Sequence, residues 1–360
     1  MFSQVHSRIP VAVLGATGMV GQRFIELLQG HPWFELAALG ASEGRAGRSY
    51  GEVAKWRLAG SSMPGAVAAM QVSACRPGAL PDEVRIVFSA LPAEAAQEIE
   101  ADFARAGKAV FSNAKSYRME PDVPLLIPEV NADHAQAILQ QHERRGWPGS
   151  IVTNANCSAT PLVMAIKPLQ SAFGVRKVMV TTLQAISGAG YPGLPSYDIL
   201  DNAIPFIGGE EEKVEIETRK MLGTWSEGSG FNDAAIIVSA HCNRVATREG
   251  HLERASVELA READLQEIIA VWENYTSEAQ ELELPSAPAR ALVYRHEVDR
   301  PQTLLDRDEG RGMSVTIGRL QRCPILGYKF ALLGHNTIRG AAGGSILNAE
   351  LCVRKGLIGS

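Results

Sequence analysis

One cysteine of the chain stands in a setting suited to nucleophilic chemistry. Cys157 lies in the polar segment Asn154–Pro161, which comes directly before an apolar stretch with helical spacing, residues 162–169. Serine, threonine and proline favour the first turn of a helix. We therefore expect the thiol at a helix N-terminus, where its pKa falls and its reactivity rises. The sequence predicts that Cys157 is a nucleophile.

A thiol nucleophile needs a base, and two histidines compete for that role. His251 begins an expected strand and shares the covered face of that strand with Ala255 and Val257, whereas His241 lies earlier in the same segment. A histidine on a covered face is commonly just a satisfied core residue, so the spacing alone does not establish a catalytic role. It favours His251 and leaves His241 as the alternative.

A glycine-rich turn near the N-terminus has the spacing of a dinucleotide-binding loop. The segment Gly15–Gly21 reads Gly-Ala-Thr-Gly-Met-Val-Gly and connects an apolar strand to a helix. Glycines let the backbone turn tightly and approach a pyrophosphate, and the helix N-terminus supplies amide donors. The alternative is a tight strand–helix turn without a ligand.

The residues after the second strand bear on the choice of cofactor. An acidic residue at that point would bind the ribose hydroxyls and favour NAD. Here Ser42 takes that place and Arg45 follows, and a hydroxyl with a guanidinium suits a 2′-phosphate. The pattern predicts NADP. In the alternative, NAD binding, Glu43 would face the ribose.

Two further patterns are chemically suggestive but have simple structural explanations. Glu217 and Lys220 are spaced so that one helix face presents both, as an exposed ion pair also would. The segment Ser187–Gly193, Ser-Gly-Ala-Gly-Tyr-Pro-Gly, would let a ring approach the backbone, or would only form a turn.

The elements that must position these residues change character near residue 153. Before it, short apolar strands alternate with helices, which predicts a parallel sheet with right-handed crossovers in an α/β, Rossmann-like domain. The expected strands are 9–14, 35–39, 84–90 and 109–111, and the expected helices are 22–28 and 93–106.

Beyond that point the strands are longer and alternate better. They predict an α+β domain with a mainly antiparallel sheet that is covered on one face. A helix at 261–275 is expected on that face, and another helix closes the chain at 337–354. If the strands carrying Arg244 and His251 pair as a hairpin, both side chains approach one pocket. The expected strands are 175–186, 232–245, 251–259, 313–320 and 327–333.

Length and composition agree with two domains and exclude several classes of protein. The chain has 360 residues, a formal net charge of −5 and no basic tract, so nucleic acid and anionic membranes are not expected partners. No apolar run is long enough for a membrane helix, and the N-terminus lacks a signal-peptide core. Five separated cysteines without a CxxC pair indicate reduced thiols in the cytoplasm and no metal site.

Taken in order, these segments cover nearly the whole chain and resemble the aspartate-β-semialdehyde dehydrogenase family of the archaeal and fungal type. Several segments in the right order are more specific than any one motif. The matching segments are 15–21, 89–92, 112–118, 154–161, 187–193, 215–220, 242–251 and 336–343.

The resemblance implies an activity. It is NADP-dependent reductive dephosphorylation of β-aspartyl phosphate to aspartate β-semialdehyde through a cysteine thioester, in the biosynthesis of lysine, threonine, methionine and isoleucine. It also implies an NADP-binding domain at 1–156, joined by the C-terminal helix 337–360, and a catalytic and dimerisation domain at 157–336. The expected partners are small molecules and inorganic phosphate, and the expected assembly is a homodimer or homotetramer.

The resemblance further assigns roles to single residues. Cys157 is implied as the nucleophile and His251 as the acid/base. For the substrate, it implies Arg244 at the α-carboxylate, Glu217 near the amino group, Lys220 and Arg118 at phosphate, and Asn156 and Gln184 lining the site. For NADP, it implies Gly15, Thr17, Gly18, Met19, Val20, Ser42, Arg45, Ser89, Leu91, Ser187, Gly188 and Asn336.

Three other functions remain as alternatives. One is a related acyl reductase that acts on malonyl-CoA or N-acetylglutamyl phosphate. The second is a cysteine acyltransferase or hydrolase with a vestigial nucleotide fold, which would not bind NADPH tightly. The third is a nucleotide-sensing protein without catalysis, which would not need to retain a nucleophile.

Overall fold

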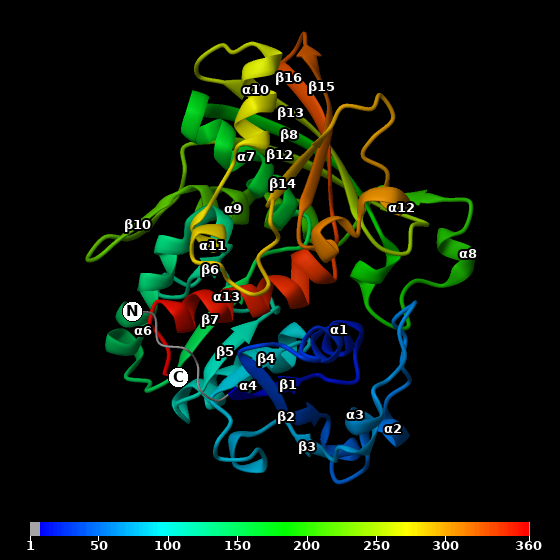
Figure 1. Cartoon of the computed structure of the whole chain (residues 1–360), viewed down its shortest axis with the longest axis vertical. Helices are drawn as coiled ribbons and strands as arrows, with labels where there is room; N and C mark the ends of the chain where they lie inside the picture. The colour runs from blue at the N-terminus through cyan, green and yellow to red at the C-terminus, as the bar shows by residue number, and fades with distance from the viewer. Residues whose placement is uncertain (1–7, 360) are drawn as a thin grey trace. The chain divides into compact units, whose positions relative to one another are not determined.

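The computed structural model describes residues 8–359, which form two compact units. The first unit comprises the described residues up to Leu126, the segment Asp133–Asn154 and the chain from Ser345 onward. The second comprises Ile127–Ala132 and Ala155–Gly344. Each unit has its own seven-stranded sheet (Figure 1).

The sheet of the first unit is entirely parallel and has the strand order β3-β2-β1-β4-β5-β7-β6. Its central strands are apolar and buried, as strands with helices on their faces must be. The expected Rossmann-like α/β architecture is confirmed. The strands are β1 (Ile9–Leu14), β2 (Phe34–Ala41), β3 (Val72–Ala74), β4 (Ile86–Ser89), β5 (Ala109–Ser112), β6 (Leu125–Leu126) and β7 (Ser150–Asn154).

The helices of the first unit follow the strands as predicted, with shifted ends. Helix α1 (Met19–Leu27) begins before the expected Gln22, because Gly18 already has the extended backbone of an N-cap. Helix α4 (Ala93–Arg105) agrees with the expectation to within one residue. The other helices are α2 (Tyr50–Val53), α3 (Gly65–Ala69) and α6 (Ala137–Arg145).

The closing helix is shorter than expected. Helix α13 (Gly343–Arg354) starts after the predicted Thr337, because Ala341 has a non-helical backbone and residues 338–342 form a π turn. From Ser345 onward α13 belongs to the first unit, where buried Glu350 lies 2.8 Å from the Nε2 atom of His31.

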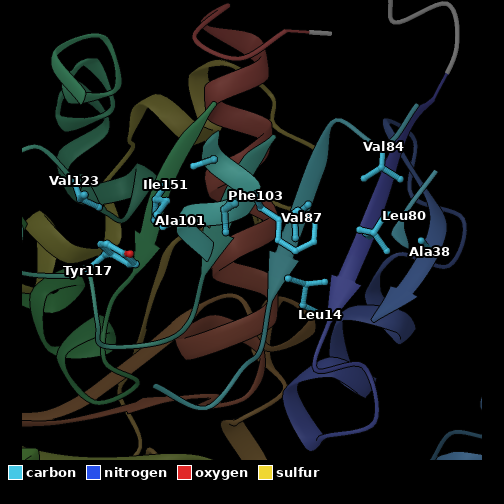
Figure 2. Close-up of a cluster of buried hydrophobic side chains, with 13 residues drawn as sticks. Leu14, Ala38, Leu80, Val84, Val87, Ala101, Phe103, Tyr117, Val123 and Ile151 are labelled. Carbon is cyan, nitrogen blue, oxygen red and sulfur yellow. The ribbon is translucent and has the colours of Figure 1, made fainter. Parts of the chain in front are cut away.

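An apolar cluster joins α4 to the strands of the first unit. Phe103 of α4 packs in one buried cluster with Leu14, Val87 and Ile151, which come from β1, β4 and β7 (Figure 2). Burial of one such side chain contributes about 1.5–3 kcal/mol to folding. This cluster fixes α4 under the carboxyl ends of β4 and β5.

The sheet of the second unit is mixed, and most neighbouring strands are antiparallel, as predicted. Its order is β14-β15-β16-β13-β8-β12-β9, with parallel pairs only at β14/β15 and β8/β12 among the described strands. The strands are β8 (Val175–Gln184), β9 (Ala203–Ile204), β12 (Ile237–Val245), β13 (His251–Leu259), β14 (Leu292–Arg295), β15 (Val315–Cys323) and β16 (Gly327–Gly334).

The expected hairpin between the strands of Arg244 and His251 is wrong. Strand β8 lies between β12 and β13 and pairs with both, so Arg244 is opposite Gln184 and Leu252 is opposite Leu183. The two side chains therefore flank the same end of β8 rather than facing each other directly. The short connection at 246–250 crosses over β8.

Other predicted strands also have different ends in the structure. Strand β12 begins at Ile237 rather than Asn232. The amides of Ala234 and Ile236 donate to the carbonyls of Arg219 and Ala234 and therefore do not pair with β8. Residues Gly230–Asn232 form β11, which pairs with β10 (Thr224–Ser226) in a separate ribbon. Strand β8 ends at Gln184, two residues early.

Helices α7 (Ala159–Phe173), α9 (Glu210–Leu222) and α10 (Leu265–Glu273) contact the second sheet. Helix α7 is buried along most of its length, and its carbonyl at Ala165 accepts a 2.9 Å hydrogen bond from Trp272 of α10. Helix α10 begins later than predicted because Asp264 caps it in a capping box. The short helices are α5 (Pro128–Asn131), α8 (Ser196–Ile199), α11 (Glu278–Glu281) and α12 (Thr303–Asp306).

Candidate active site

A thiol and an imidazole meet in the second unit. The Sγ atom of Cys157 lies 3.3 Å from the Nε2 atom of His251. The amide of Ala185 donates a 3.1 Å hydrogen bond to the Nδ1 atom of the same ring. Because Nδ1 is an acceptor, the neutral ring carries its proton on Nε2, which faces the sulfur.

The environment of His251 keeps its ring neutral. The side chain is completely buried at the start of β13. Burial, reinforced by the positive charge of Arg244, lowers the pKa of His251 to about 3. The ring therefore offers a single N–H to the sulfur throughout the neutral pH range.

Cys157 lies at the N-terminus of α7, but Asn156 rather than Ser158 or Thr160 caps the helix. The Oδ1 atom of Asn156 accepts hydrogen bonds of 2.8 and 3.1 Å from the amides of Ser158 and Ala159. The Thr160 hydroxyl instead donates to the Asn156 carbonyl. The residue before Cys157 thus fixes the first turn of the helix.

Two glutamates of α9 hold Asn156 in turn. Glu217 accepts a 2.6 Å hydrogen bond from the Asn156 amide, and Glu210 accepts a 2.8 Å hydrogen bond from the Asn156 side chain. Glu210 also accepts a hydrogen bond from the side chain of Gln184 and pairs with Lys213. Burial opposes ionisation of Glu210, but these hydrogen bonds and the lysine charge outweigh it and lower its pKa.

Glu210 is a site residue that the sequence analysis missed. It precedes Glu217 by two helical turns and therefore lies on the same face of α9, which is the only signal that the sequence offers.

Arg244 and Gly188 lie beside the imidazole. The buried guanidinium of Arg244 donates a 2.7 Å hydrogen bond to the Ala185 carbonyl. A Cβ atom on Gly188 would lie 2.8 Å from Nη1 of Arg244 and 3.4 Å from Nε2 of His251. Glycine is therefore needed where the loop after β8 crosses these two side chains.

A second loop contacts Cys157. A Cβ atom on Gly340 would lie 2.8 Å from the Cβ atom of Cys157, so this glycine touches the cysteine directly. The neighbouring Arg339 forms a buried, two-pronged ion pair with Glu129, both bonds being 2.7 Å long. Gly340 is another contact that the sequence analysis did not identify.

Asn336 connects two loops of the site in the second unit. Its side chain donates a 2.8 Å hydrogen bond to the Ser187 hydroxyl and accepts one of 2.8 Å from the amide of Gly250. It therefore ties the loop after β8 to the turn that carries His251.

The two residues implied at phosphate are both buried cations. In the second unit, the Nζ atom of Lys220 lies 4.3 Å from the centre of the Phe231 ring. In the first unit, Arg118 donates a 2.8 Å hydrogen bond to the carbonyl of Asn113.

The glycine loop of the first unit has the shape that a pyrophosphate needs. Gly15 has a φ of +69°, and a Cβ atom there would lie 2.5 Å from the Ala90 carbonyl. A Cβ atom on Gly21 would lie 2.3 Å from the Gly15 carbonyl. The chain can pass this closely only with glycine. Gly18 is the N-cap of α1, and a helix N-terminus at this position suits an anionic ligand.

The surroundings of Ser42 favour a 2′-phosphate over a free ribose. Arg45 lies in a 3₁₀ turn directly after Ser42 and donates a 2.6 Å hydrogen bond to the Thr17 hydroxyl of the glycine loop. Glu43 instead lies 3.9 Å from the guanidinium of Arg76. The carboxylate thus has a cationic partner, while Arg45 faces the loop.

The remaining residues implied for NADP lie at the same end of the parallel sheet. Ser89 is buried at the end of β4. The Ala90 carbonyl, which packs on Gly15, follows it, and half-buried Leu91 comes next. Met19 and Val20 form the first turn of α1. The carboxyl end of a parallel sheet is where such folds bind nucleotides.

The described residues contain no cluster of histidine, cysteine, aspartate and glutamate suited to a metal ion. Within the same residues, no helix is long and apolar enough to cross a membrane. A dinucleotide fold followed by a unit with a paired thiol and imidazole defines the class of oxidoreductases that work through a cysteine.

Comparison with known proteins gives the family. Residues 10–138 match the model "Semialdehyde dehydrogenase, NAD binding domain", and residues 166–339 match "Semialdehyde dehydrogenase, dimerisation domain". The aspartate-semialdehyde dehydrogenase of Archaeoglobus fulgidus is 49% identical, over 98% of this chain and 100% of its own length. That of Schizosaccharomyces pombe is 48% identical, over 97% and 99%. The chain belongs to the aspartate-semialdehyde dehydrogenase family.

A solved structure extends the likeness to three dimensions. The aspartate-semialdehyde dehydrogenase of Candida albicans, described as a structure with NADP, superposes with a TM-score of 0.88 at 42% identity, covering 97% of this chain and 99% of that one. The alternative acyl reductases and the cysteine hydrolase or acyltransferase are not favoured by these likenesses.

Proposed function

We propose that this chain catalyses NADP-dependent reductive dephosphorylation of β-aspartyl phosphate to aspartate β-semialdehyde, and its reversal, in the biosynthesis of lysine, threonine, methionine and isoleucine. The observation that carries the proposal is the 3.3 Å contact between the Cys157 sulfur and His251 at a capped helix N-terminus. The shared name of the relatives supports the substrate, and the NADP in the Candida albicans structure supports the cofactor.

Cys157 forms the covalent intermediate. Its thiolate attacks the acyl carbon of β-aspartyl phosphate, a carbon–sulfur bond forms, and phosphate leaves with the electrons of the carbon–oxygen bond. The product is a thioester on Cys157. A thioester is both easily reduced and easily cleaved by phosphate, so one intermediate serves both directions of the reaction.

His251 moves or shares a proton at the sulfur and the substrate oxygen. When bound, NADPH supplies the hydride that reduces the acyl carbon. With its proton on Nε2, His251 stabilises the thiolate that leaves as the thiohemiacetal collapses to the aldehyde. In the oxidising direction the same Nε2–H donates a hydrogen bond to the thiohemiacetal oxygen and stabilises the negative charge on it as hydride leaves.

Charged side chains of the second unit recognise the amino acid. Arg244 can bind the α-carboxylate through two parallel hydrogen bonds. Glu217 offers a carboxylate to the ammonium group while it holds the Asn156 amide. Gln184 and Asn156 line the site through their bonds to Glu210. Lys220 and Arg118 are proposed as ligands of phosphate.

NADP would be held by both glycine-loop and strand-end residues. The loop Gly15–Val20 would bind the pyrophosphate, and Ser42 with Arg45 would bind the 2′-phosphate. Ser89, Leu91, Ser187, Gly188 and Asn336 are proposed as further contacts.

The assembly and location extend the same proposal. The match to a dimerisation domain supports a homo-oligomer, a dimer or a tetramer. We place the contact between copies on the open face of the second sheet. Met179 of β8 and Ile237 of β12 are exposed there, on two neighbouring strands. The five cysteines form no disulfide among the described residues, which supports the cytoplasm as the location.

A direct assay tests the proposal. NADPH formation from aspartate β-semialdehyde and NADP should depend on phosphate, while malonate semialdehyde with coenzyme A should give none. Phosphate-independent oxidation, or a preference for the coenzyme A reaction, would overturn the proposal in favour of a related acyl reductase.

A further inference from the structure

The first unit contains a buried carboxyl group that the proposed reaction does not use. Glu100 of α4 is completely buried, under the carboxyl ends of β4 and β5. Its Oε1 atom accepts a 2.8 Å hydrogen bond from the Ser112 hydroxyl at the end of β5. A carboxyl group is rarely buried this deeply without a role.

A chain of hydrogen bonds leads from this carboxyl group to Arg118. The Ser112 oxygen that donates to Glu100 also accepts a 3.1 Å hydrogen bond from the Ala114 amide. Between these two residues, the Asn113 carbonyl accepts the 2.8 Å hydrogen bond from the Arg118 guanidinium. The orientation of that carbonyl therefore depends on the turn that Glu100 anchors through Ser112.

The rest of this loop is held independently of Glu100. The Ser116 hydroxyl donates a 2.9 Å hydrogen bond to the Ala93 carbonyl, and the Tyr117 hydroxyl donates to the Gln97 carbonyl. The Asn113 side chain donates to the Ser89 carbonyl at 3.1 Å. Loss of the Glu100 charge should thus loosen the first turn of the loop and leave the loop folded.

We propose that Glu100 is a positioning residue for Arg118: through Ser112, its carboxylate fixes the turn that presents the guanidinium to the phosphate of the substrate. The proposal rests on the proposed function of Arg118 as a phosphate ligand. In the ionised state Glu100 accepts the Ser112 hydroxyl and attracts Arg118, and protonation weakens both interactions.

The protonation state of Glu100 changes within the working pH range. Burial raises the pKa of Glu100 to about 7, although the hydroxyls of Ser89 and Ser112 and the charge of Arg118 favour the ionised form. Among the described residues, Tyr117 also interacts electrostatically with Glu100. Strands β4, β5 and β7, which contact α4, carry no titratable residue. Phosphate binding should therefore weaken as the pH falls through about 7.

The test compares wild-type protein with Glu100→Gln, which keeps the size of the side chain, and with Ser112→Ala, which removes the next link. The KM values for phosphate, aldehyde and NADP are measured in the oxidising direction from pH 6 to 8.5. At pH 8 both variants should raise the KM for phosphate about three- to tenfold, the size of one lost hydrogen bond. The KM values for aldehyde and NADP should change less than about twofold.

The pH dependence separates positioning from a merely structural role. Phosphate itself titrates near neutral pH, but this affects wild type and Glu100→Gln equally. The ratio of their KM values for phosphate therefore reports the effect of Glu100 alone. That ratio should fall towards one at pH 6, where wild-type Glu100 is also protonated. Glu98→Gln, on the exposed side of α4, should behave as wild type at every pH.

An unchanged or lowered KM for phosphate in Glu100→Gln would overturn the inference, as would a pH-independent ratio or an equal rise in all three KM values. Failure of the proposed function is distinguishable from these results, because wild-type protein would then show no phosphate-dependent oxidation at all.

Discussion

Individual side chains around Cys157 are fixed by partners that take no part in bond making. The Ala185 amide selects the nitrogen of His251 that carries the proton, and Asn156 orders the helix turn that carries the sulfur. Both arrangements depend on contacts within the protein alone. Catalytic groups held in this way need no reorganisation during the reaction.

The buried neutral ring of His251 predicts a pH-dependent stability. The folded pKa is about 3 and the unfolded pKa is the ordinary 6.5, so between these values only the unfolded chain binds the proton. The unfolding free energy should therefore fall as the pH is lowered from about 6.5, by about 1.4 kcal/mol per pH unit from this group.

Thermal unfolding of wild type and His251→Asn between pH 7.5 and 5 measures this effect. The variant lacks the titrating ring, so its midpoint should fall less on acidification than the midpoint of wild type. Parallel pH profiles for the two proteins would show that His251 is protonated when folded, contrary to its burial.

Glu210 should matter for rate although it makes no proposed contact with the reacting atoms. Glu210→Ala leaves the side-chain amides of Asn156 and Gln184 without their shared acceptor, a loss of about 1–3 kcal/mol per buried group. We expect kcat to fall about tenfold or more. Iodoacetamide should also label Cys157 more slowly.

Glu210→Gln keeps an acceptor and should lose less activity than Glu210→Ala. Glu212→Gln, on the exposed face of the same helix, is the matched control and should retain full activity. If Glu210→Ala kept the wild-type kcat and labelling rate, Glu210 would not be required to hold Asn156 in position.

The sequence identified the residues of this site better than their connections. Cys157 stood out because polar residues precede an apolar helix, and His251 because it begins a strand. The role of Glu210 could not be predicted, because its partner Asn156 is distant in sequence and meets it only when α9 packs against the start of α7. Spacing within one helix places Glu210 on the same face as Glu217 but does not show which residue that face contacts.

Among the elements, β8 organises the site. It separates β12 from β13, so that Arg244 and His251 approach from either side of its carboxyl end, and the loop after it passes between them through Gly188. The alternation of apolar residues predicted these strands but could not show which strands pair. The short connection after Val245 resembles a hairpin turn, although β8 is inserted there.

Gly188→Ala should weaken substrate binding through Arg244. The added methyl group would lie 2.8 Å from Nη1 of Arg244 and displace a guanidinium that binds the Ala185 carbonyl. Steady-state kinetics should show a KM for the aldehyde raised about tenfold or more, as expected for a charged hydrogen bond. The backbone of Gly188 is not left-handed, so the variant should fold normally.

Gly208→Ala is the control for this prediction, because an added Cβ atom there meets nothing within 4 Å. It should leave all kinetic constants unchanged. An unchanged aldehyde KM in Gly188→Ala would mean that Arg244 tolerates displacement and does not bind the carboxylate.

At the scale of the whole molecule, the open face of the second sheet should hold two copies together. Met179→Lys or Ile237→Lys would bury a charge in that contact, which is costly without a partner. Sedimentation should then show a smaller species than wild type. Ile325→Lys, at an exposed turn between β15 and β16, should leave the assembly intact. If both Met179→Lys and Ile237→Lys kept the wild-type assembly, the contact between copies would not lie on this face.

The whole-molecule architecture was largely predictable from the sequence. Strands that alternate with helices before residue 153, and longer alternating strands after it, correspond to the two sheets. The π turn before α13 was not predictable, because it depends on Ala341 in a backbone conformation that the residue type does not favour. That turn places Gly340 against Cys157.

The most direct test of the account is to trap the intermediate on Cys157. The enzyme is mixed with aspartate β-semialdehyde and NADP without phosphate, and the intact protein and its peptides are weighed by mass spectrometry. We predict one NADPH per active site, an aspartyl group on Cys157 alone, and release of that group when phosphate is added. Continuous NADPH formation without phosphate, or an acyl group on another residue, would contradict it.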